Sequence, residues 1–151
     1  MAQIDDEYTR ISRASHFIDS LFGLNKEFLT HAAACGSRPG ALVPLEVTGK
    51  GLRVAGFGLA AEAFPRLVRT PSGPYAMEYA FFVKCDDELT EVSRFYLASG
   101  GRLVESLLPV EGTANVTICD HNNSNIAMIL TCRVLVGLLD SSVLAPRPEV
   151  S

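Results

Sequence analysis

No apolar run in this sequence is long enough to cross a bilayer. The longest spans residues 126–139, roughly 14 residues against the ~20 that a membrane helix needs. The N-terminal segment MAQIDDEYTRIS carries acidic side chains, whereas a secretory signal begins with basic residues followed by an apolar stretch. The sequence therefore predicts a cytoplasmic protein with no membrane partner.

The cysteines form no dense framework and no CxxC pair. Four are present and widely spaced: Cys35, Cys85, Cys119 and Cys132. This spacing argues against a disulfide scaffold and predicts free, mostly buried thiols. An alternative is a zinc site formed by two pairs, His31 with Cys35 and His121 with Cys119. Neither pair has the short-loop spacing of a structural zinc module, so no metal is expected.

The short motifs of common nucleotide and hydrolase sites are also missing. The chain has no GxGxxG or GxxxxGK[ST] loop, no GxSxG nucleophile and no HExxH zinc motif. No cofactor is therefore expected, and catalysis is not predicted, although nothing in the sequence excludes it. The balance of 17 acidic and 13 basic side chains gives a net charge of −4, which argues against a nucleic-acid partner.

The first third of the chain has the apolar spacing of a helix. Apolar side chains recur there at intervals of three and four residues: Ile11, Ala14, Ile18, Leu21 and Phe22. Gly23 interrupts this pattern, and Asn25 is suited to cap a second segment that Gly36 would end. Residues 1–36 are therefore predicted to form a helical arm, either two helices joined at a kink or one long bent helix.

After residue 40 the apolar period changes from 3.6 to 2, which is typical of strands. Residues 43–47 and 52–57 flank the turn sequence TGKG and predict a hairpin, with Pro44 placing its first strand at a sheet edge. Residues 75–84 alternate most clearly. Further strands are predicted at residues 66–70, 89–98, from 102 onward and 114–119. For residues 89–98 a helix is the alternative.

The apolar run at residues 126–139 is predicted to be a central buried strand, although its periodicity does not exclude a buried helix. Residues 114–119 would pair with it through the loop 120–125. One of its faces would carry Arg133, which needs a carboxylate or an anionic ligand because an isolated buried charge is not tolerated. Three carboxylates on or near predicted strands are candidate partners: Glu78, Glu91 and Glu105.

These segments predict an α+β fold with a single globular domain over residues 1–139. In it the arm would pack on an antiparallel meander of about seven to eight strands within residues 41–139. That sheet would either stay open under the helix or curl into a barrel. The chain of 151 residues is long enough to bury a core without metals or disulfides. Residues 140–151 are predicted to be a polar tail.

Four side chains are candidates for a ligand site: Arg133, His121, Asp120 and Tyr79. An arginine inside an apolar segment could hold an anion, and a carboxylate beside an imidazole can orient a general base. No obvious nucleophile accompanies Asp120 and His121, so no catalytic residue is assigned.

The first functional hypothesis is a non-catalytic binding or assembly module that forms a homo-oligomer or binds a protein partner. It rests on the arm, which carries more apolar residues than one sheet face can cover. One alternative is a protein or enzyme that binds an anionic small molecule in a pocket inside the curled sheet. Another is single-stranded nucleic-acid binding on an aromatic sheet face, which Glu78 and Glu91 disfavour by interleaving with the aromatic residues.

Overall fold

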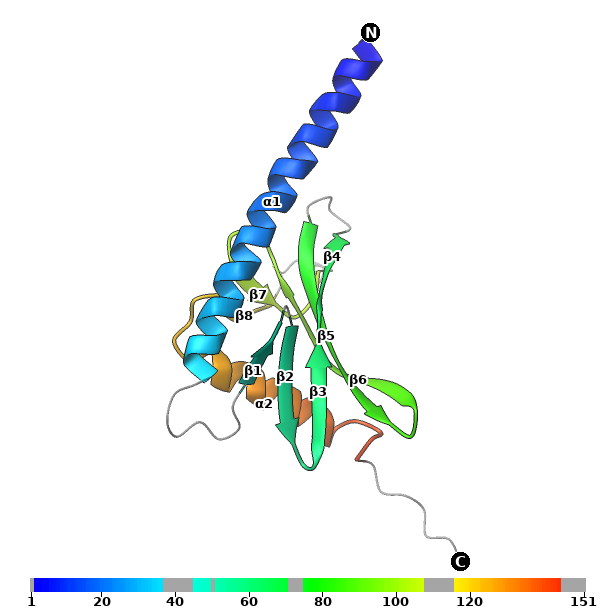
Figure 1. The fold of residues 1–151 in the computed structure, drawn as a ribbon, viewed down its shortest axis with the longest axis vertical. Coiled ribbons are helices and arrows are strands. Elements are labelled where there is room, and N and C mark those ends of the chain that lie inside the picture. Colours follow the sequence, from blue (N-terminus) through cyan, green and yellow to red (C-terminus); the bar gives the residue numbers. More distant parts are fainter. Residues whose placement is uncertain (1, 37–44, 50, 71–74, 108–115, 145–151) are drawn as a thin grey trace, which may run out of the picture.

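The computed structural model describes residues 2–36, 45–49, 51–70, 75–107 and 116–144 (Figure 1). In these residues one helix precedes and one follows eight strands along the chain: α1 (Ala2–Gly36), β1 (Leu45–Thr48), β2 (Gly51–Gly56), β3 (Leu59–Ala63), β4 (Pro65–Arg69), β5 (Tyr75–Cys85), β6 (Glu88–Leu97), β7 (Arg102–Val104), β8 (Thr117–Asp120) and α2 (Ile126–Leu139). The fold is α+β, as the sequence predicts.

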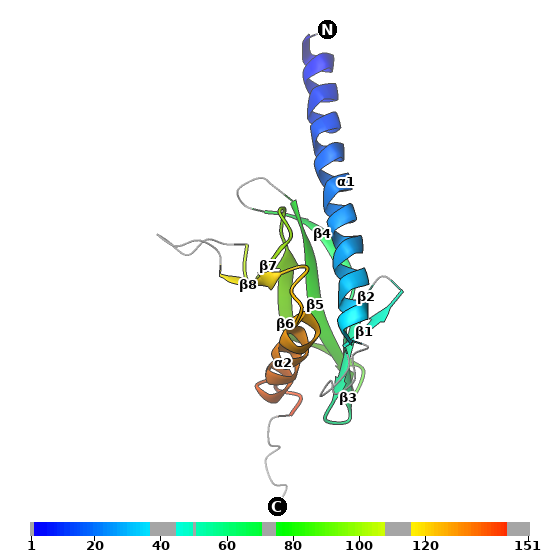
Figure 2. The same cartoon turned by 90° about the vertical axis from the view of Figure 1, so that its left-hand side faces the viewer.

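The strands form one antiparallel sheet that curls into a half-barrel (Figures 1 and 2). Its order is β1-β2-β3-β5-β6-β7-β8, and β4 pairs with the N-terminal half of β5. The predicted hairpin is present as β1 and β2, with β1 at the sheet edge, while Pro44 lies outside the described residues. Residues 88–97 are a strand, which settles the alternative at 89–98 in favour of the strand.

The prediction of a strand at residues 126–139 is wrong, because these residues form α2. Apart from Thr131 and Arg133 the run is apolar, and such a run shows no period that separates strand from helix. In α2 the buried positions recur at helical spacing: Ile126, Ala127, Leu130, Thr131, Val134 and Leu138. The predicted pairing of 114–119 with this segment is also wrong, since β8 pairs with β7.

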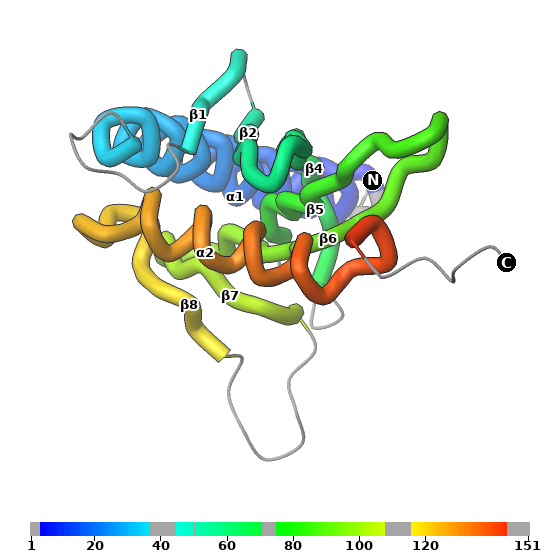
Figure 3. The backbone as a smooth tube through the Cα atoms, turned by 90° about the horizontal axis from the view of Figure 1, so that it is seen from below, coloured from blue at the N-terminus to red at the C-terminus, as the bar shows by residue number. Residues whose placement is uncertain are grey.

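Helix α1 runs without a break from Ala2 to Gly36, so neither Gly23 nor Asn25 ends it. Its C-terminal half packs on the sheet through side chains spaced by four and three residues: Leu21, Asn25, Phe28, Ala32 and Cys35. Its N-terminal half projects beyond the sheet (Figures 1 and 2). Helix α2 lies beside α1 and contacts β6, β1 and β2 (Figure 3).

Both helices and one face of the sheet share a single core, with an aromatic cluster at its centre. Tyr79 of β5 and Phe95 of β6 stack with ring centroids 5.0 Å apart. Phe28 of α1 meets both rings edge-on, at 5.5 and 5.9 Å. All three side chains are buried. These aromatic residues therefore hold α1 against the sheet and are not available to stack on bases.

Candidate functional site

The projecting half of α1 carries large apolar side chains that nothing in the described chain covers. Ile4, Tyr8 and Ile11 keep 63%, 73% and 67% of their surface exposed, and Phe22, in the half of α1 that packs on the sheet, keeps 49%. Together with Ile18 they follow the alternating three- and four-residue spacing of a coiled-coil helix, with Ser15 filling the remaining position. We call Ile4, Tyr8, Ile11, Ile18 and Phe22 the arm stripe.

A groove of about 780 Å³ lies beside the C-terminal half of α1. Its apolar wall comes from one helix and three strands: Phe22, Leu29 and Ala33 of α1, Val47 of β1, Pro65 of β4 and Met77 of β5. Lys26 of α1 also lines this α1 groove and is exposed. Because Phe22 belongs to both surfaces, the arm stripe runs directly into the groove.

Charges are unevenly distributed along α1. Asp5, Asp6 and Glu7 form an acidic turn at its start, and Lys26 lies five turns further on. The ion pairs found among the described residues include none made by these four side chains. The arm stripe is thus flanked by charges that have no ion-pair partner in the described part of the chain.

Tyr79, predicted as a ligand residue, lies in the core. Its hydroxyl donates a hydrogen bond to Oδ1 of the buried Asn25 in α1. Burial raises the pKa of the Tyr79 hydroxyl well above its usual range. Tyr79 therefore stays neutral and joins α1 to β5.

His121 joins the β8–α2 connection to two other parts of the fold. Its Nδ1 lies 3.0 Å from the carbonyl oxygen of Gly101, and its Nε2 lies 3.3 Å from the Glu27 carboxylate of α1. A Cβ at Gly101 would lie 2.2 Å from Nδ1, so glycine makes this approach possible. His31 of α1 binds the same connection, with Nε2 2.8 Å from the carbonyl oxygen of Asn123.

Arg133 lies on α2 and pairs with Glu105, one of the three carboxylates nominated from the sequence. Its Nη1 donates to Glu105 Oε1 at 2.8 Å. Its Nε is buried and has no hydrogen-bond partner among the described residues. Burial and Asp120 raise the pKa of the neighbouring Cys119 thiol, and Arg133 lowers it. Arg133 therefore sits at the contact between α2 and the β7–β8 edge.

Arg133→Met is expected to change the free energy of unfolding by less than about 1 kcal/mol. The ion pair is partly exposed, so its loss costs little, and the substitution also removes a buried donor without a partner. Urea denaturation of the Arg133→Met and Glu105→Gln variants would measure the change in the free energy of unfolding that each substitution causes. A loss of several kcal/mol in Arg133→Met would show that the pair is essential to the fold.

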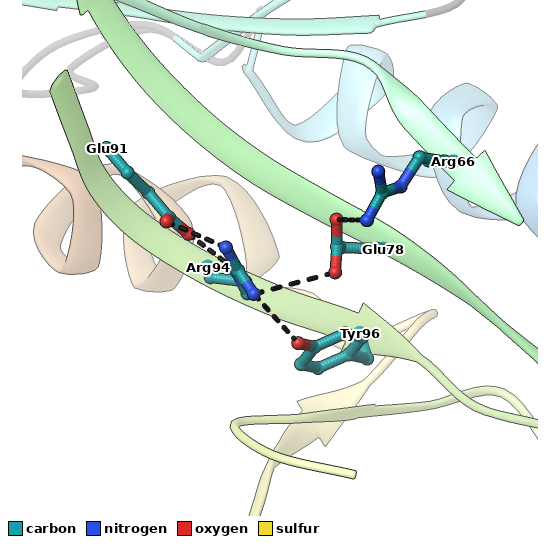
Figure 4. Close-up of polar contacts among 5 residues, drawn as sticks. All are labelled: Arg66, Glu78, Glu91, Arg94 and Tyr96. Carbon is teal, nitrogen blue, oxygen red and sulfur yellow. Dashed lines mark hydrogen bonds and ion pairs between the residues drawn. The ribbon is translucent and has the colours of Figure 1, made fainter. Parts of the chain in front are cut away.

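The other two nominated carboxylates pair elsewhere, on the outer face of the sheet (Figure 4). Glu78 of β5 is buried between Arg66 of β4, at 3.2 Å, and Arg94 of β6, at 3.7 Å. Arg94 also donates to both oxygens of Glu91, which raises the pKa of Arg94, and to the Tyr96 hydroxyl at 3.4 Å. Both arginines in this network have carboxylate partners, which does not favour phosphate binding on this face.

The four residues predicted as a ligand site are thus held in separate contacts. Among the described residues no hydrogen bond or ion pair joins any two of Arg133, His121, Asp120 and Tyr79. Asp120 is exposed at the end of β8, where its carbonyl oxygen accepts a hydrogen bond from the Asn123 amide. Their role in binding a ligand stays a prediction.

Within the part of the chain that the structure describes, no three His, Cys, Asp or Glu side chains come together as a metal site. In those same residues, neither helix combines the length and the apolar character that crossing a bilayer requires.

Comparisons with protein-family models, curated proteins and solved structures gave no match.

Proposed function

We propose that this protein is a non-catalytic assembly module that forms a homo-oligomer through the projecting half of α1. The observation that carries the proposal is the exposure of Ile4, Tyr8 and Ile11 on one side of α1, in the half that projects beyond the sheet. A helix with a heptad-spaced apolar side buries that side against another helix.

The energetics support association. Burying one isoleucine side chain contributes about 1.5–3 kcal/mol to association. In a dimer each residue of the arm stripe is buried in both copies, so its contribution counts two times. Scattered single apolar residues on a surface need no partner, but a continuous row marks an interaction site. The arm stripe is such a row, interrupted only at Ser15, and its members Ile4, Tyr8 and Ile11 lie on the half of α1 that projects beyond the sheet.

Ile11→Lys is expected to raise the dissociation constant of the oligomer by about 100-fold, since each of two copies loses about 1.5 kcal/mol of apolar burial. The melting temperature of the separated chains should not change, because Ile11 lies outside the core. Sedimentation velocity over a concentration series would measure the first effect and thermal unfolding of dilute protein the second.

Thr9→Lys is the matched control. Thr9 is exposed on the same part of α1, also β-branched, but points away from the arm stripe. It should leave the dissociation constant within about twofold of wild type. A wild-type chain that stays monomeric at the highest attainable concentration, or equal effects of the two substitutions, would refute assembly through the arm stripe.

A further inference from the structure

We propose that two copies pair through α1 in antiparallel orientation, so that the first turns of each arm lie along the α1 groove of the other copy. Asp5 of one copy then lies beside Lys26 of the other. This inference rests on the proposed self-assembly and adds to it the orientation, the register and the use of the groove.

The arm stripe and the groove lie on one face of the same helix. At 100° per residue, Ile4, Ile11, Phe22 and Leu29 all fall within about 20° of one line along α1. The stripe is exposed at Ile4 and Ile11, and the groove opens at Phe22 and Leu29. A helix that follows the stripe of its partner therefore enters the groove, with the β1 edge and β4 forming the other wall.

Charge favours the antiparallel orientation over the parallel one. Parallel, in-register helices would place two acidic turns, each made of Asp5, Asp6 and Glu7, side by side, and would align the two helix dipoles. They would also bring both sheets to the same end of the pair, since the sheet covers only the C-terminal half of α1. Antiparallel helices avoid all three problems.

Charge also selects the register. When Ile4 faces Leu29 of the partner, Ile11 faces Phe22 and Ser15 faces Ile18. In this register Asp5 of one copy lies beside Lys26 of the other, next to these apolar contacts. Neither side chain has an ion pair within the described chain. A shift by one heptad would place Asp5 beside Asp19. The helices overlap for about 38 Å in the favoured register.

The register is tested first by charge reversal. Asp5→Lys and Lys26→Asp should each raise the dissociation constant of the dimer by about 5–10-fold, because two-fold symmetry turns two attractive pairs into repulsive ones. The double variant should return to within about twofold of wild type. Asp6→Lys makes the same charge change on the opposite side of α1, and it should have little effect.

Disulfide trapping gives the second readout, in a Cys132→Ser background because Cys132 is the exposed thiol. A mixture of the Asp5→Cys and Lys26→Cys proteins should form a mixed disulfide dimer, whereas Asp5→Cys alone should not cross-link to itself. Self-linkage of Asp5→Cys would indicate parallel helices and overturn the inference.

The outcomes separate this inference from the proposed function. A wild-type monomer would refute self-assembly itself. A dimer that Ile11→Lys dissociates, but that shows neither charge rescue nor the mixed disulfide, would refute the antiparallel register alone. A third outcome would also overturn the inference. If the wild type is monomeric and decanoate raises its melting temperature but not that of Lys26→Asp, the groove binds an amphipathic acid.

Discussion

Replacement of Phe95 by alanine is expected to reduce the free energy of unfolding by about 3–5 kcal/mol. Phe95 is only 1% exposed and stacks on Tyr79 with ring planes 10° apart. Phe28 of α1 also packs edge-on against it. Alanine would therefore leave a cavity at the point where α1, β5 and β6 meet, and chemical denaturation would measure the loss.

Phe64→Ala provides the control for this measurement. Phe64 follows β3 and is 63% exposed, so its truncation should cost no more than about 0.5 kcal/mol. Comparable losses in the two variants would mean that the aromatic cluster is not the centre of the core. A selective loss of helical signal in Phe95→Ala would show that α1 detaches from the sheet before the sheet unfolds.

The strands at the centre of the sheet could be predicted from the sequence because large apolar side chains alternate there with mostly small or charged ones. In β5 the large side chains of Met77, Tyr79 and Phe81 alternate with Glu78 and Ala80. This period of two differs from the 3.6-residue period of a helix. Residues 126–139 lack such a contrast. There the choice between strand and helix depends on tertiary packing, and length was the better guide, since strands rarely exceed about 10 residues.

The candidate surface was only partly readable from the sequence. The spacing of Ile11, Ile18 and Phe22 predicts a helix with an apolar side, and an excess of apolar residues on the arm is visible in the composition of that segment. Where the sheet ends along α1 is not visible, because it follows from strand lengths and curvature. Ile4 and Tyr8 are exposed because the sheet ends before it reaches the N-terminal half of α1.

Arg133 shows why a correct chemical requirement does not locate a site. A partly buried arginine needs a carboxylate, and Glu105 supplies it. The two other nominated carboxylates, Glu78 and Glu91, pair with arginines of the sheet instead. Any of the three satisfies the charge rule, so the choice among them depends on the path of the chain, which places Glu105 opposite α2.

Gly137→Ala is expected to reduce the free energy of unfolding by about 1–3 kcal/mol, although alanine is normally favoured over glycine inside a helix by about 1 kcal/mol. Helix α2 crosses β6 at this residue. A Cβ at Gly137 would lie 2.0 Å from the Val92 carbonyl oxygen, a contact that the rigid strand backbone cannot relieve. Helix α2 would therefore have to move away from the sheet and lose part of its burial.

Gly23→Ala tests the same substitution where nothing opposes it. Gly23 lies inside α1, and a Cβ there would meet no heavy atom within 4 Å. This variant should gain about 0.5–1 kcal/mol from helix propensity alone, so the two substitutions are expected to shift the midpoint of urea unfolding in opposite directions. If Gly137→Ala also raises the midpoint, α2 does not pack against the backbone of β6 as closely as the structure indicates, and the requirement for glycine at residue 137 fails.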